Sequence, residues 1–145
     1  MNKHGVTLLA VMAALCIPAL AQESKTPPVK HKIVFELNAP APSGWDQLFN
    51  NVKNVQQIFA ADGVQVEIVF FGKGLRMLLK GNDEFAARLK EASEKGVILA
   101  ACQNTMRAMK IKSEDLFPFS TEVDSGVAEL VRKQEAGFSY IKGGE

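Results

Sequence analysis

The sequence predicts a doubly wound α/β domain, with a mainly parallel, five-stranded sheet flanked by helices. Strand-like and helix-like segments alternate about five times along the chain, which is typical of βαβ units. One strand, VILAA at 97–101, is short and continuously apolar, as expected for a strand that is covered on both faces of a parallel sheet. The 145 residues correspond to one domain, which we place at 32–145.

The N-terminus has the pattern of a secretory signal peptide, which we predict over residues 1–21. A lysine near the start precedes an apolar run over 6–17, and the sequence ALA at 19–21 is a small-x-small cleavage site. The apolar run is shorter than the roughly 20 residues that a bilayer-spanning helix needs, so a retained anchor is the less favoured alternative. We expect cleavage after Ala21, a periplasmic location, no membrane attachment after cleavage, and a flexible lead-in over 22–31.

The first half of the domain reads as two strands around an amphipathic helix. Apolar and β-branched residues predict a strand over 32–38, and apolar residues at three- and four-residue spacing predict a helix over 45–61. The run VQVEIVFF predicts a second strand over 64–71. Gly72-Lys73-Gly74 then predicts a turn that leads into a short helical piece over 75–80.

The second half continues the alternation, with apolar residues inside each element and glycines at the helix ends. The elements expected there are, in order, a helix over 84–95, the strand over 97–101, a helix over 103–109, an irregular stretch over 111–119, a strand over 119–123, a helix over 127–135 and a strand over 138–142.

Charge and composition exclude several classes of function. The formal net charge is +1 and no block of basic residues is present, which argues against a nucleic-acid-binding protein. Two cysteines and two histidines do not form a recognisable zinc-binding pattern. Removal of the signal leaves one cysteine, Cys102, and one histidine, His31, so the mature chain cannot form an internal disulfide. We expect neither a metal nor an organic cofactor.

Cys102 is the strongest candidate for a functional side chain. It lies between the buried strand at 97–101 and a helix whose first turn is Gln103-Asn104-Thr105. The free N–H groups and the positive end of this helix are expected to face the sulfur and to favour the nucleophilic thiolate. Arg107, one turn further on, and Lys73, from the neighbouring loop, are cations that would add to this effect if the sulfur lies close to them.

The predicted topology brings other segments to the same place. Parallel sheets have their sites at the carboxyl edge of the strands, which here collects Asn38, Gly72-Lys73-Gly74 and Cys102. The two glycines resemble a phosphate-cradling turn, but they lack the spacing of the known phosphate-binding fingerprints. A tight turn that needs glycine backbone freedom is the simpler interpretation.

Three other interpretations were weighed. Cys102 could be a packed structural residue, since free cysteines are often buried. A Cys-His or Ser-His-Asp arrangement is disfavoured because His31 precedes the first strand and therefore belongs to the opposite edge of the sheet. Paired carboxylates for hydrolysis are disfavoured too: Glu36 and Glu67 lie within strands, and we interpret the acidic residues of the chain as solvated surface groups.

Four segments resemble a known family. They are GVILAACQNTMRAMKI at 96–111, EDLFPF at 114–119, SGVAELVRKQEAGFSYIK at 125–142 and VEIVFFGKGLRMLL at 66–79. These segments are similar to the DsrE/DsrF-like (YchN-like) sulfur-relay superfamily, and in particular to its exported branch.

The resemblance implies a five-stranded parallel fold, homo-oligomers, and a cysteine that accepts sulfane sulfur as a persulfide. Cys102 matches that cysteine, and Asn104 and Arg107 match its recurring neighbours. The leading hypothesis is therefore an exported sulfur carrier that uses Cys102, with a donor or acceptor protein as its partner. The alternative is a non-catalytic small-ligand-binding or assembly module in which Cys102 is merely packed.

Overall fold

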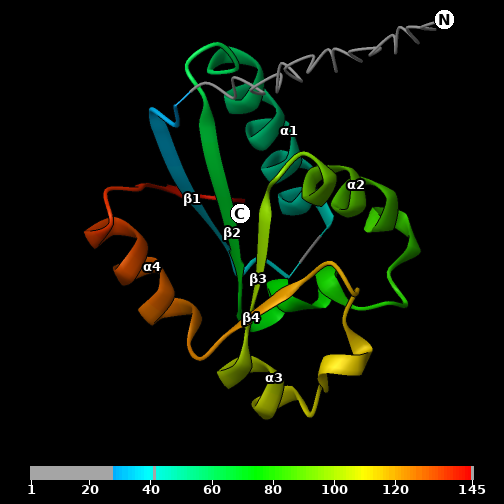
Figure 1. The fold of residues 1–145 in the computed structure, drawn as a ribbon. Coiled ribbons are helices and arrows are strands. Elements are labelled where there is room, and N and C mark those ends of the chain that lie inside the picture. Colours follow the sequence, from blue (N-terminus) through cyan, green and yellow to red (C-terminus); the bar gives the residue numbers. More distant parts are fainter. Residues whose placement is uncertain (1–27, 41, 145) are drawn as a thin grey trace, which may run out of the picture.

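The computed structural model describes residues 28–40 and 42–144, and five strands form its single sheet. The strands are β1 (His31–Leu37), β2 (Val64–Phe70), β3 (Ile98–Cys102), β4 (Thr121–Val123) and β5 (Ser139–Lys142). Their order across the sheet is β4-β3-β2-β1-β5, and every neighbouring pair is parallel. The predicted doubly wound α/β class is therefore confirmed, with a sheet that is wholly rather than mainly parallel (Figure 1).

Helical segments connect the strands. They are α1 (Pro42–Ile58), the 3₁₀ helix η1 (Gly72–Leu78), α2 (Asp83–Glu94), α3 (Gln103–Met109), the 3₁₀ turn η2 (Ser113–Asp115) and α4 (Gly126–Glu135). The predicted helix at 45–61 begins and ends three residues too late. Proline suits the first turn of a helix, where its missing N–H is not needed. At the other end, residues 59–62 form a turn, and Gly63, at φ +74°, then leads the chain into β2.

The segment Gly72-Lys73-Gly74 is the start of η1 rather than a turn that precedes a helix. Gly72 has a φ of +52°, which favours glycine. At Gly74 a β-carbon would lie 2.3 Å from the carbonyl oxygen of Leu37, so only glycine lets η1 pass this close to the end of β1. The positive φ of Gly72 and the close backbone contact of Gly74 therefore explain why glycine occupies both positions.

The direction in which the strands advance decides which helices cover which face. From β1 through β2 and β3 to β4 the chain moves toward one edge, and it then returns through α4 to place β5 beside β1 at the other edge. Because βαβ crossovers are nearly always right-handed, the return connection puts α4 on the face opposite to α1 and α2. Figure 1 shows α4 on one side of the sheet and the other two helices across it.

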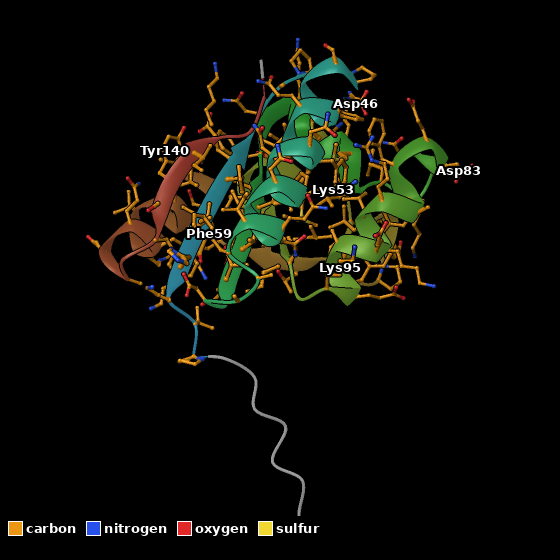
Figure 2. The ribbon with its side chains drawn as sticks, turned by 90° about the horizontal axis from the view of Figure 1, so that it is seen from above. Asp46, Lys53, Phe59, Asp83, Lys95 and Tyr140 are labelled. Atoms are coloured by element: carbon orange, nitrogen blue, oxygen red, sulfur yellow. The ribbon has the colours of Figure 1, made fainter. Side chains whose placement is uncertain are left out.

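The two faces carry separate apolar clusters. The larger includes Phe35, Ile68 and Leu99 from the sheet together with residues of α1, η1, α2 and α3. The smaller consists of Val34, Val69, Ala100, Leu130 and Phe138 beneath α4. Figure 2 shows α1, marked by Asp46 and Lys53, side by side with α2, which begins at the labelled Asp83 and ends just before the labelled Lys95.

The predicted signal peptide lies outside the described residues, as does most of the predicted lead-in. Within residues 28–40 and 42–144, no helix is long and apolar enough to cross a membrane. His31, which we placed in the lead-in, is instead the first residue of β1 and pairs with Val64.

Candidate functional site

Several of the predicted site residues meet at the carboxyl edge of the sheet. Asn38 follows β1, Gly72 follows β2, and Cys102 is the last residue of β3. A β-carbon at Gly72 would lie 3.8 Å from that of Asn38, so the two loops are in contact. Gly74 packs against the backbone of Leu37 and Asn38. The parallel topology therefore assembles these segments as predicted, at the lower end of the strands in Figure 1.

Cys102 is buried at this edge, with 4% of its surface exposed. It follows Ala100 by two residues in β3, so its side chain faces α4. The backbone N–H of Gly126, the first residue of α4, donates a hydrogen bond to the Cys102 sulfur over 3.1 Å. The sulfur thus lies between the end of β3 and the first turns of α3 and α4.

The pKa of the Cys102 thiol is set by two opposing influences. Burial raises it, because a thiolate is poorly solvated in the protein interior. Interactions with the hydroxyl and the backbone N–H of Thr105, and with the N–H groups of Gly126 and Asn104, lower it. The lowering prevails, so the pKa of Cys102 lies below the ordinary thiol value of 9.0. The local chemistry therefore favours the nucleophilic form of the side chain.

Thr105 connects the sulfur to the loop after β2. Its side-chain oxygen accepts a hydrogen bond of 3.0 Å from the backbone N–H of Gly72. The same hydroxyl also interacts with the Cys102 thiol and lowers its pKa. A threonine hydroxyl can take part in both interactions, because it has one donor and two acceptor sites. Gly72 thus belongs to the surroundings of the sulfur through Thr105.

The predicted cations do not take part. The Arg107 guanidinium bonds to the side-chain oxygen of Asn104, and Lys73 is exposed. Neither contributes to the lowered pKa of Cys102. The groups that lower the pKa of Cys102 are instead neutral donors, and a role of Arg107 or Lys73 beside the thiolate stays a prediction. Of the predicted site residues, Asn104 helps to lower the pKa of Cys102 through its backbone N–H.

Two contributors were absent from the predicted site. Gly126 directly precedes the predicted helix over 127–135, and Thr105 lies in the first turn of the predicted helix over 103–109, but neither is among the predicted site residues. The signal for Gly126 was nevertheless in the sequence, because it begins the helix that follows the strand beside Cys102. The rule that places Gly72 and Cys102 at the carboxyl edge places Gly126 there as well.

The interpretation of Glu67 as a solvated acid is wrong. Its side chain points beneath α4 and the residue is 1% exposed. Lys133 of α4 reaches it over 2.5 Å. Glu67 lies at the middle of β2, where covering helices exclude water on both faces of the sheet. His31, in contrast, lies at the amino end of β1, far from the carboxyl edge, as expected.

A hollow on the surface of the described residues lies apart from Cys102. It has a volume of about 720 Å³ and is bordered by the start of α1, by η1, and by the segments before α2 and around η2. Trp45, Leu79 and Ile111 give it apolar walls. Charged residues of both signs line it as well: Arg76, Lys80, Glu84, Glu114 and Asp115. Within the described part of the chain, Arg76 is the one arginine without a hydrogen-bonding partner. This hollow is therefore separate from the surroundings of the thiol.

Comparisons with known proteins agree with this architecture. The model of the DsrE/DsrF-like family matches residues 43–142. A solved structure, a protein of unknown function, MTH1491, from Methanobacterium thermoautotrophicum, is similar with a TM-score of 0.68 and 27% identity, covering 77% of this chain and 98% of its own. No curated protein matches. The match spans α1 to β5 and includes Cys102 and both helix starts that face it, so the chain belongs to the DsrE/DsrF-like family.

Proposed function

We propose that this protein carries sulfane sulfur on Cys102 as a persulfide. One observation carries the proposal: the sulfur sits at the carboxyl edge of the sheet and receives the Gly126 N–H over 3.1 Å, in surroundings that lower its pKa. Family membership supports the same chemistry. The site needs no cofactor, because the thiolate itself is the nucleophile.

The transfer balances as an exchange between two sulfur compounds. The Cys102 thiolate attacks the outer sulfur of a donor persulfide, R–S–SH, and a new S–S bond forms on Cys102. The donor's S–S bond breaks, and R–S⁻ leaves with the electron pair of that bond. Delivery to an acceptor thiolate is the same step in reverse, with Cys102 as the leaving group. A lowered pKa aids this second step, because thiols of lower pKa leave faster.

The burial of Cys102 shapes how a donor reaches it. Only 4% of the residue is exposed, and the first residue of α4 lies against the sulfur. A donor therefore needs the start of α4 or of α3 to move aside before its sulfur reaches Cys102. We propose that a partner protein or a second copy of the chain produces this opening when it docks, in keeping with the expected homo-oligomer.

The location of this activity forms part of the proposal. The signal-like pattern of residues 1–21 supports export and cleavage after Ala21. An exported carrier would receive its sulfur from a periplasmic donor. Cell fractionation followed by N-terminal sequencing tests this directly, and a chain that stays in the cytoplasm with its first residues intact would contradict export.

Mass spectrometry tests the carrier function. The protein is incubated with polysulfide, alkylated, digested and measured peptide by peptide, which separates Cys102 from Cys16. We expect a sulfur adduct of about 32 Da on the Cys102 peptide and none in the Cys102→Ser variant. Absence of the adduct on a thiol shown to be free by alkylation after unfolding would contradict the proposal.

The hollow next to Arg76 supports a second candidate function, the binding of a small ligand. Its volume of about 720 Å³ is within the usual range of ligand pockets, and apolar walls with a free guanidinium suit an apolar molecule that carries an anionic group. Under this function the Cys102→Ser variant binds as the wild type does, whereas Arg76→Gln binds more weakly. Calorimetric titration with a medium-chain fatty acid separates the two candidates.

A further inference from the structure

The helix α4 is attached to the sheet by few apolar contacts. Only Gly126 and Leu130 are buried along its length. Val127 and Val131 are 60% and 48% exposed. By comparison, α1 buries five residues, including Trp45. Apart from the close approach of Gly126 to Phe71, apolar packing therefore does little to determine the position of α4 along the sheet.

A buried ion pair lies beneath the second half of this helix. Glu67, from the middle of β2, is the one buried charged residue in the described part of the chain. Its carboxylate lies 2.5 Å from the Lys133 ammonium, which also lies 3.5 Å from the Glu129 carboxylate. Arg132 pairs with Glu129 over 2.7 Å. Lys133 thus connects α4 to the sheet and to the other charged groups of the same helix.

Such a pair contributes more to position than to stability. Burying the Glu67 carboxylate, and much of the Lys133 side chain, offsets most of the attraction between the two charges, and apolar side chains of similar size often serve stability equally well. The bond between Lys133 and Glu67 is, however, short and directional, as charge-assisted hydrogen bonds are. A slide of α4 by even one or two ångströms would break it and leave a buried charge without a partner. The pair therefore selects one position of the helix.

That position matters at the other end of α4. Lys133 lies about two turns, or roughly 10 Å, from Gly126 along the helix axis. The Gly126 N–H meets the Cys102 sulfur over 3.1 Å. The same end of the helix is closely packed, since a β-carbon at Gly126 would lie 3.0 Å from that of Phe71. A helix this short moves as a rigid unit, so a displacement at Lys133 is transmitted to Gly126.

We propose that Glu67 and Lys133 are positioning residues for the thiol: their ion pair fixes α4 along the sheet so that the Gly126 N–H meets the Cys102 sulfur and favours its thiolate form. The inference rests on the proposed function for its importance, because positioning matters only if the sulfur reacts. Glu67 and Lys133 would act on Cys102 only through the position of α4, without contacting a substrate.

The experiment measures the titration of Cys102 in folded protein, by thiolate absorbance near 240 nm relative to a Cys102→Ser reference and by the pH profile of iodoacetamide alkylation. In Glu67→Gln, Lys133 loses its charged partner on the sheet and keeps only Glu129 of its own helix. We expect Cys102 to titrate at higher pH and to be alkylated about threefold more slowly at pH 7, as a pKa rise of about half a unit requires. Lys133→Arg keeps the cation and is expected to titrate close to the wild type.

Two further variants separate positioning from stability. The double variant Glu67→Leu, Lys133→Leu has no unpaired buried charge, so it is expected to fold while it still shows the shifted titration. Glu91→Gln breaks a similar ion pair with Lys95, 2.6 Å long, on the surface of α2 and is the matched control. It is expected to leave the Cys102 titration unchanged.

The outcomes are distinct. If the folded double variant and Glu67→Gln titrate as the wild type does, the positioning role is wrong. A shift of equal size in Glu91→Gln would also overturn it, since the effect would then be a general one of charge. If the titration shifts as expected but no variant, the wild type included, gains a persulfide, the sulfur-carrier proposal fails while the positioning of the thiol stands.

Discussion

The two faces of the sheet are built on different principles. On the face of α1 and α2, a continuous apolar cluster extends from Ile33 to Leu116 and includes Phe35, Phe85 and Leu89 at 1% exposure or less. On the face of α4, five buried apolar residues share the space with the Glu67–Lys133 ion pair and the Cys102 thiol. One face is an ordinary apolar core, and the other combines a small core with polar contacts.

This difference separates stability from chemistry. The free energy of folding comes mainly from buried apolar area, which the α1–α2 face supplies. The α4 face carries the thiol and the Gly126 N–H that bonds to it, and it is held by contacts that can be broken without unfolding the rest. Elements that move during function come from the least stable parts of a protein. We therefore expect changes on the first face to alter stability alone and changes on the second to alter Cys102 as well.

The largest expected effect is on stability, from a truncation on the α1–α2 face. Leu89 of α2 is fully buried in the large cluster. Leu89→Ala leaves a cavity and should lower the free energy of unfolding by about 3–5 kcal/mol, as measured by urea denaturation. The Cys102 titration of the folded variant should remain that of the wild type, because α2 has no part in the thiol site.

The same substitution on the other face gives the matched comparison. Leu130 is 7% exposed and is the main apolar anchor of α4. Leu130→Ala should cost less, about 2–3 kcal/mol, because part of the site is open to solvent and the helix can settle into the space. The folded variant should nevertheless titrate Cys102 at higher pH. An equal effect of both leucine variants on the thiol would contradict the separation of the two faces.

Periodicity and topology predicted the fold and the place of the site. The helix over 103–109 has the predicted limits, and each strand lies within two residues of its predicted bounds, because apolar patterns are a local property of the sequence. The parallel arrangement then brings Asn38, Gly72 and Cys102 to one edge, since loops that follow parallel strands must emerge there.

The electrostatics of the site could not be predicted in this way. The topology places Lys73 and Arg107 near Cys102. The partners of long side chains, however, depend on local geometry, and the Arg107 guanidinium bonds to the side-chain oxygen of Asn104. Glu67 was missed because a charged residue inside an apolar strand looks exposed until its partner is known. That partner, Lys133, comes from a helix 66 residues later in the sequence, and only the return of α4 over the sheet brings the two together.

A smaller effect on stability is expected at the contact between α4 and the sulfur itself. In Gly126→Ala the new methyl group would meet Phe71 at 3.0–3.2 Å and push the start of α4 outward. Alanine also reduces the conformational freedom of the unfolded chain, which stabilises the fold by about 0.4–1 kcal/mol and offsets this strain, so the free energy of unfolding should change by less than about 1 kcal/mol. Cys102 should nonetheless titrate at higher pH as the N–H withdraws.

Gly81→Ala is the control for that substitution, because a β-carbon at Gly81 has open space around it. Its Cys102 titration should equal that of the wild type. If Gly126→Ala also leaves the titration unchanged, the Gly126 N–H does not stabilise the thiolate, and the lowered pKa must come from Thr105 and Asn104 alone.

The smallest expected effect is the change with pH in the contribution of Cys102 to the free energy of unfolding. The pKa of Cys102 is lower in the folded chain than the ordinary value of 9.0 that applies on unfolding. Above pH 9 both states hold the thiolate, and the contribution of its donors to stability is fully present. As the pH falls through the lowered pKa, the folded state takes up a proton and this contribution is lost. The difference in unfolding free energy between the wild type and Cys102→Ala should therefore grow from neutral pH toward pH 9 and then level off. Urea denaturation of both proteins across this range measures it, and a difference that does not vary with pH would mean that the α4 face holds Cys102 as a neutral, packed thiol.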